Sequence, residues 1–195
     1  MYKRQQQSGW TAREILATVC VLYNNETDLF SNEHIRMAFD LAIDRTAVTK
    51  AAGAENRAAT GLVPHGIPDA GETEDDFRTT LCAIDEESLG ERQDKAREEL
   101  TFAGYYSNAM FPPIELLYVS GTENDAVAAL LQQTWSSVLS VNVMLHGVTQ
   151  AEYESRMEEG NYELALKKVT ALYDDAMSFL DRWCSEDEQN LIGYE

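Results

Sequence analysis

Three short apolar runs alternate with two helical patterns between residues 114 and 171, and this stretch predicts the centre of the fold. The runs cover residues 114–119, 141–148 and 162–171. Apolar residues recur at helical spacing over 122–139, and a shorter polar helix is expected over 150–159, where Gly160 ends it. Runs of this length are typical of strands with both faces covered. The order strand, helix, strand, helix, strand predicts an α/β layer with a mixed, mostly parallel sheet flanked by helices.

The chain before this stretch predicts one more strand and several helices. Residues 15–23 alternate as a strand and end in Asn24. A helix with Ser31 or Asn32 as its N-cap follows, and Asp44 caps a second helix that ends at Gly53. A third helix is expected over 86–103, and an amphipathic segment over 176–183. Residues 54–85 are rich in Gly, Pro and acidic side chains, which indicates a long loop.

Ligands of open α/β sheets bind beyond the carboxyl ends of the parallel strands. In this sequence those ends lead into residues 119–122, 146–149 and 172–175. We therefore expect any small-molecule site to involve these loops.

Charge limits the classes of partner. The chain has 195 residues with 34 acidic and 15 basic side chains, and its formal net charge is −19. Nucleic acids and anionic membrane surfaces are recognised through Lys and Arg, so neither is an expected partner. Residues 1–12 carry no apolar signal core and are expected to be disordered. Residues 1–5 also resemble the translated end of a transposon used in sequencing libraries, which leaves a non-native leader as an open alternative.

Residues with catalytic chemistry are scattered. Cys20, Cys82 and Cys184 lack metal-ligand spacing, so we expect neither a metal nor a cofactor. His34, His65 and His146 are predicted to have structural or solvated roles, because no nucleophile motif accompanies them. An enzyme is therefore not expected, although a small α/β hydrolase using Cys or Ser remains an alternative, which turnover lost on replacement of Cys20 or His146 would support.

Several segments resemble the extracytoplasmic solute-binding proteins of oligopeptide and dipeptide ABC importers. Residues 30–45 are similar to that family's F-x-x-x-x-V-R-x-A helix, which ends in A-I-D-R, and residues 99–105 are similar to its L-L-x-x-A-G-Y motif. The resemblance continues in the family's order from about residue 22 to residue 194. The other matching segments are 60–64, 113–118, Trp135 with 141–143, and 160–165.

The resemblance implies a periplasmic-binding-protein-like lobe within a two-lobed protein that closes on a peptide and hands it to an ABC permease. Residues 13–195 would form mostly the second lobe, with a hinge strand near 15–24, and the export signal would lie outside this segment. The implied location is periplasmic or extracellular, with a lipid anchor as an alternative. The full-length protein is expected to be a monomer.

The resemblance also suggests ligand-binding positions and one departure. Peptide binders of the family carry W-x-x-D-Y-x-D-P after the third strand, and the first Asp pairs with the peptide's α-ammonium. This sequence has Val169 and Leu172 at the aromatic and acidic positions. A buried ammonium needs a charged acceptor, so either a nearby carboxylate replaces it or the solute is not a free amine. The candidate ligand-binding residues are Asn24, Asn124, Tyr173, Asp174, Asp175 and Asn190.

Three alternatives to peptide binding therefore stay open. In the first alternative, the same architecture binds a sugar, a metal chelate or another non-peptide solute, and Leu172 favours this alternative. The second alternative is the small α/β hydrolase. The third alternative is a domain that binds another protein through this lobe alone. For Asp174 and Asp175, the sequence also predicts a purely structural role at the start of the last helix.

Overall fold

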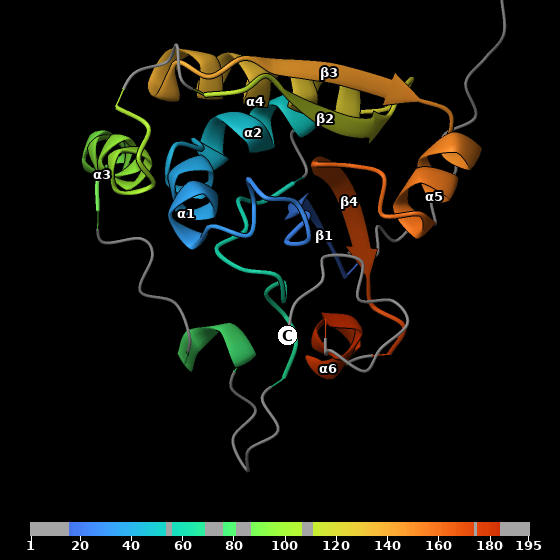
Figure 1. Ribbon diagram of the computed structural model, residues 1–195. Coiled ribbons are helices and arrows are strands. Elements are labelled where there is room, and N and C mark those ends of the chain that lie inside the picture. Colours follow the sequence, from blue (N-terminus) through green and yellow to red (C-terminus); the bar gives the residue numbers. More distant parts are fainter. Residues whose placement is uncertain are drawn as a thin grey trace, which may run out of the picture.

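A mixed four-stranded sheet forms the centre of the computed structural model (Figure 1). The structure describes residues 16–53, 56–68, 76–80, 87–106, 111–173 and 175–183, without the side chains of 79, 80 and 182. The strand order in the sheet is β1-β4-β2-β3. The strands are β1 (Ala17–Tyr23), β2 (Ile114–Val119), β3 (Val143–Val148) and β4 (Leu164–Thr170). The predicted α/β class and mixed sheet are confirmed.

Strand β4 joins a parallel half of the sheet to an antiparallel one. Strands β2 and β3 are parallel along their whole length, from Ile114 opposite Val143 to Val119 opposite Val148. Strand β1 runs antiparallel to β4 from end to end. The carboxyl ends of β2, β3 and β4 therefore share one edge of the sheet with the amino end of β1. We call this the carboxyl edge.

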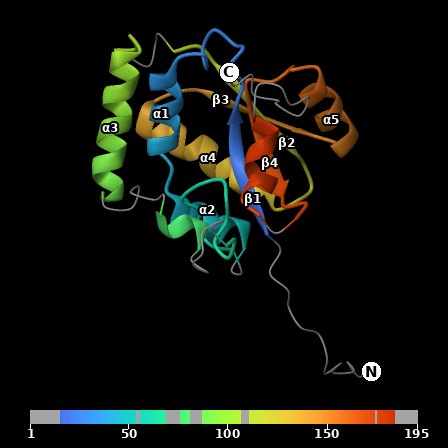
Figure 2. The ribbon, with the colours of Figure 1, turned by 90° about the horizontal axis from the view of Figure 1, so that it is seen from below.

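Helices cover both faces of the sheet. Figure 2 shows α1, α2, α3 and α4 on one side of the strands and α5 on the other. The helices are α1 (Glu33–Leu41), α2 (Arg45–Ala52), α3 (Leu89–Phe102), α4 (Asn124–Leu139), α5 (Gln150–Glu158) and α6 (Met177–Leu180), with 3-10 turns at Phe77–Thr80 and Asp181–Trp183. Across these described ranges, no helix has the length and apolar character that a membrane crossing requires.

Side-chain caps define where the helices begin. The Asn32 side chain accepts from the amide of His34, and Asp44 accepts from the first amides of α2, as the sequence predicts. Helix α3 begins at Leu89, three residues later than the predicted start at 86. The reason is a capping box in which Ser88 and Glu91 each accept from the other's backbone amide.

The largest apolar cluster lies between the sheet and helices α1, α3 and α4. Its centre is Trp135, which is fully buried and donates its indole N–H to the carbonyl of Phe39 at 2.9 Å. A second cluster lies under α5, and a third joins Val63 and Ile67 to the end of β4 and to Phe179 of α6. The third cluster therefore packs the end of β4 against α6.

Candidate functional site

The connections out of β2 and into β4 lie on opposite faces of the sheet. The chain leaves β2 through α4 on one face, reaches β3, and returns to β4 through α5 on the other face (Figure 2). Neighbouring strands whose connections lie on opposite faces form a topological switch point, and a crevice opens at their carboxyl ends. In this sheet the switch point lies between β2 and β4.

The two strands separate at this point. Strand β2 pairs with β4 at Leu116 with Leu164 and at Leu117 with Ala165, and beyond these pairs β4 turns away from β2 (Figure 1). A cavity of about 250 Å³ fills the gap, and we call it the switch-point cavity. It is lined by Val119, Thr122, Glu123, Asn124, Gln150, Tyr153, Leu166, Lys167 and Lys168. It therefore reaches from the start of α4 to the start of α5 and occupies the edge that the sequence predicts.

Tyr153 of α5 stabilises the separation of the strands. Its hydroxyl donates to the carbonyl of Leu166 at 2.9 Å, one residue beyond the last pair between β2 and β4. Burial raises the pKa of this phenol, so it keeps its proton and remains a donor. The Leu166 carbonyl, which β2 does not reach, thus has a hydrogen-bond donor, and the gap between β2 and β4 stays open.

The loop after β4 presents apolar side chains at the same edge. Leu172 is 78% exposed and Tyr173 is 49% exposed. The backbone amides of both residues donate to the hydroxyl of buried Ser178 in α6, at 2.6 and 3.3 Å. The Tyr173 hydroxyl donates to Asp181 at 2.7 Å. The loop is thus held by α6 while the Leu172 side chain faces outward.

Three of the predicted ligand-binding residues lie at the carboxyl edge. Asn124 lines the switch-point cavity, and Tyr173 lies in the loop after β4. Asp175 accepts from the amide of Met177 at 2.7 Å, which matches the structural role predicted for it at the start of α6. Asp174 and Asn190 lie outside the described residues.

Asn24 lies at the opposite edge of the sheet. Because β1 is antiparallel to β4, the end of β1 faces Leu164 at the start of β4. The Asn24 side chain is buried, and its amide donates to the carbonyls of Gly160 and Tyr162 at 3.0 and 2.9 Å. Its oxygen accepts from the amide of Glu26 at 3.1 Å. The structure therefore places Asn24 as a clamp between β1 and the turn before β4, away from the other predicted site residues.

Sequence reasoning missed Tyr153, Lys167 and Lys168 as site residues. Nothing in the sequence marks Tyr153 as a candidate, because its role depends on where β2 and β4 separate. The two lysines could have been identified from the sequence. Consecutive lysines inside a mostly apolar strand, in a chain with 34 acidic and 15 basic residues, mark a local concentration of positive charge.

The three histidines contact carboxylates, and Cys20 is a weakly acidic thiol. Each ring Nδ1 lies near a carboxylate: Glu99 for His34, Asp76 for His65 and Glu115 for His146. Burial raises the pKa of Cys20 to about 12, so the thiol stays protonated at neutral pH and is a poor nucleophile. Within the described ranges, no group of three His, Cys, Asp or Glu side chains could hold a metal ion. Cys82 and Cys184 lie outside those ranges.

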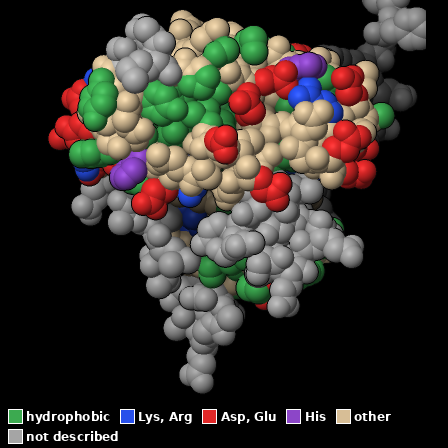
Figure 3. Space-filling model, in the orientation of Figure 1, with side chains coloured by type: hydrophobic (Ala, Val, Ile, Leu, Met, Phe, Trp, Pro, Cys, Tyr) green, Lys and Arg blue, Asp and Glu red, His purple; other side chains and the backbone are tan. Residues whose placement is uncertain are grey.

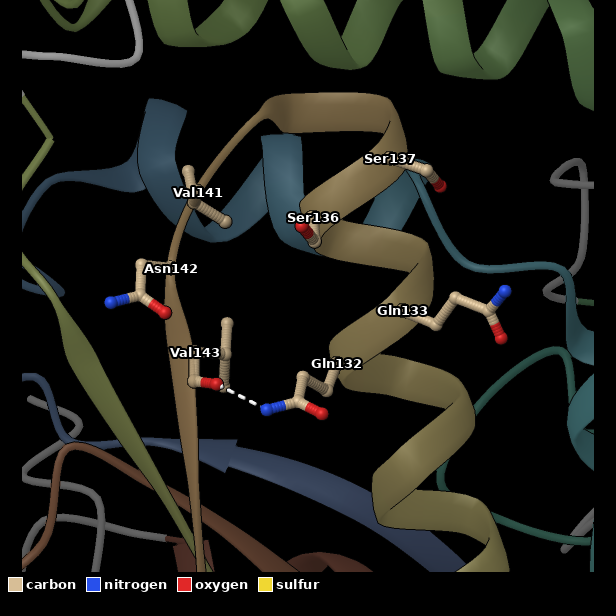
Figure 4. A pocket seen from close by; sticks show the side chains of 7 residues that line it. All are labelled: Gln132, Gln133, Ser136, Ser137, Val141, Asn142 and Val143. Carbon is tan, nitrogen blue, oxygen red and sulfur yellow. Dashed lines mark hydrogen bonds between the residues drawn. The ribbon is translucent and has the colours of Figure 1, made fainter.

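A second cavity, of about 320 Å³, lies at the other end of α4 and β3 (Figure 4). Its side chains carry no charge, and Gln132 closes one side of it by donating to the carbonyl of Val143 at 2.7 Å. It lies at the amino end of β3, so it is separate from the carboxyl edge.

Comparison with known proteins gives a family match and distant relatives. Residues 2–190 match the model of the bacterial extracellular solute-binding proteins, family 5 (middle). The Escherichia coli protein named as a probable deoxycholate-binding periplasmic protein is 26% identical over 170 residues, which cover 87% of this chain and 30% of that protein. The periplasmic oligopeptide-binding protein of Haemophilus influenzae is 24% identical and covers 92% of this chain and 32% of its own length.

Solved structures share the fold. The Haemophilus influenzae oligopeptide-binding protein in complex with RPPGFSPFR has a TM-score of 0.80 at 23% identity, and covers 92% of this chain and 34% of that chain. The pheromone receptor PrgZ has a TM-score of 0.81 at 21% identity, with 97% of this chain and 37% of that chain covered. This chain therefore spans about a third of the length of the proteins that it matches.

Proposed function

Since the chain belongs to the family 5 bacterial extracellular solute-binding proteins, we propose that it binds a peptide or peptide-like solute for delivery to an ABC importer. The observation that carries this proposal is the switch-point cavity, which lies at the same edge of the sheet as the exposed side chains of Leu172 and Tyr173. The names of two relatives, an oligopeptide-binding and a dipeptide-binding protein, support the peptide class. The chain acts by binding, without chemical turnover.

We also propose that these residues form most of the second lobe of a two-lobed protein. Residues 13–195 belong to this part, and β1 serves as a hinge strand that Asn24 fixes to the turn before β4. Closure of the two lobes would cover the carboxyl edge and remove the apolar Leu172 side chain from water. The complete protein is proposed to be a monomer in the periplasm or outside the cell, with or without a lipid anchor, and to dock on permease subunits.

A second candidate solute is a non-peptide molecule, and Leu172 favours it. This residue offers no charge to an α-ammonium, and its side chain faces outward at the carboxyl edge. A relative named for deoxycholate binding, at 26% identity, adds support for an amphipathic solute. A sugar or a metal chelate has no comparable observation in its favour among the described residues.

Thermal unfolding of the complete gene product with mixed short peptides tests the proposal. A ligand that binds only the native state stabilises it by about 2.7 kcal/mol at a hundredfold excess over its Kd. We expect peptides to raise the melting temperature and N-acetylated peptides to do so equally, because Leu172 makes no demand for an amine. No shift with any peptide would reject peptide binding. A shift that N-acetylation abolishes would show that another group takes the place of Leu172.

A further inference from the structure

The two lysines of the switch-point cavity have no carboxylate partner in the part of the chain that the structure describes. Figure 3 shows acidic side chains spread over much of the visible face, with few basic ones. In this excess of acid, Arg45, Lys95, Arg97 and Arg156 each pair with a carboxylate. Lys167 and Lys168, by contrast, make no ion pair within the described ranges.

The separation of β2 from β4 brings both lysines to one cavity. Consecutive strand residues point to opposite faces, so Lys167 points toward the α5 side of the sheet and Lys168 toward the α4 side. In a fully paired sheet these two side chains would lie on opposite faces, with the sheet between them. Here β2 has already turned away, and both lysines line the same gap.

Two helix N-termini add to the positive potential. Helix α4 begins at Asn124 and helix α5 at Gln150, and both residues line the cavity. The amide groups of a first helical turn carry a partial positive charge that favours anions. Glu123 is the acidic side chain among the lining residues, so the lysines of the lining outnumber its carboxylates by one.

The lining excludes two classes of ligand group and fits a third. A cation would meet two ammonium groups, and an apolar group would remove them from water without replacing their hydrogen bonds. A carboxylate would pair with both lysines by charge-assisted hydrogen bonds. We propose that the switch-point cavity binds a carboxylate of the solute through Lys167 and Lys168. This inference rests on the proposed function, because it gives a charge preference to part of the same site.

Matched ligands in the complete gene product test this inference. The carboxylate can come from a Glu side chain, from a peptide's C-terminus or from a non-peptide acid. Calorimetric titrations therefore compare peptides with Glu or Gln at each position, peptides with a free or amidated C-terminus, and deoxycholate with its primary amide. The test variant is the double change Lys167→Met with Lys168→Met. The single change Lys168→Met serves as a second variant that should fold normally, because Lys168 is exposed. Lys50→Met, at an exposed lysine of α2, is the matched control.

We expect at least one carboxylate ligand to bind about tenfold or more tightly than its neutral partner, with the preference weakened by salt. The double variant should reduce the ratio to about one, Lys168→Met should reduce it in part, and Lys50→Met should keep it. Equal affinities within every pair, or a preference that the double variant keeps, would overturn the inference while peptide binding itself stands. A lysine-dependent preference for deoxycholate without any peptide binding would keep the inference and reject the peptide proposal. Absence of all binding would reject both.

Discussion

The guanidinium of buried Arg78 occupies the space that a side chain at position 61 would need, because a Cβ at Gly61 would overlap Arg78 Nη1. Arg78 also donates to the hydroxyl of Thr60, which fixes the loop against the 3-10 turn that carries it. The same loop supplies Val63 and Ile67 to the cluster beneath α6. This pair of residues therefore supports the helix that holds the loop after β4.

Gly61→Ala should lower the free energy of unfolding by about 1–3 kcal/mol, the usual cost of overpacking. Denaturant unfolding of the variant measures the loss. Gly90→Ala in α3 is the matched control, because a Cβ there meets nothing within 4 Å, and it should be neutral or stabilising. Equal stability of Gly61→Ala and the wild type would mean that Arg78 moves freely and does not order this loop.

Tyr153→Phe tests whether the hydrogen bond to Leu166 holds the switch-point cavity open. The change leaves a carbonyl without its donor, and we expect a loss of about 1–3 kcal/mol in unfolding free energy. Tyr105→Phe is the control, because Tyr105 contacts the Phe111 ring and removal of its hydroxyl keeps that contact. Similar stabilities of the two variants would show that water or β2 can replace the phenol.

Asn24→Ala removes the clamp between β1 and the turn before β4. The buried side chain makes three hydrogen bonds to backbone groups of Gly160, Tyr162 and Glu26. We expect a loss of about 2–4 kcal/mol, since each buried group left unpaired costs about 1–3 kcal/mol. Asn142→Ala, at an exposed position, should cost less than about 0.5 kcal/mol. In the complete protein, solute affinity measured well below the unfolding temperature should be unchanged if Asn24 has no contact with the ligand.

Asp76 predicts a pH dependence of stability. The backbone amides of Arg78 and Gly66 donate to its carboxylate at 2.9 and 3.0 Å and hold its pKa below the usual value of an aspartate. A depressed folded-state pKa adds stability above the unfolded value, and this is lost as pH falls through the folded value. The unfolding free energies of the wild type and Asp76→Asn should therefore differ at pH 6 and converge toward pH 2. A constant difference across this range would contradict the assignment.

The sequence predicts the local structure of this chain more fully than its site. Asn32 and Asp44 cap helices as expected, and Trp135 lies in the core, because cap residues and apolar periodicity act within a few turns. The capping box of Ser88 and Glu91 makes α3 begin at Leu89, three residues after the expected start. The edge that carries the loops follows from strand order alone.

The detail of the cavity could not be predicted, for a physical reason. It depends on where β2 stops pairing with β4 and on a phenol from α5 that reaches the Leu166 carbonyl. Both are contacts between segments distant in the chain. Local pattern likewise could not place Asn24, because its distance from the other candidates follows from the antiparallel register of β1.

Photo-crosslinking in the complete gene product tests the central claim that the solute binds at the carboxyl edge. A tight-binding ligand with a photoreactive group is irradiated, and mass spectrometry maps the adducts. We expect adducts in residues 119–124, 150–153 and 166–173, and unlabelled ligand should suppress them. Suppressible adducts confined to residues 132–143, at the second cavity, or none on this chain at all, would contradict it.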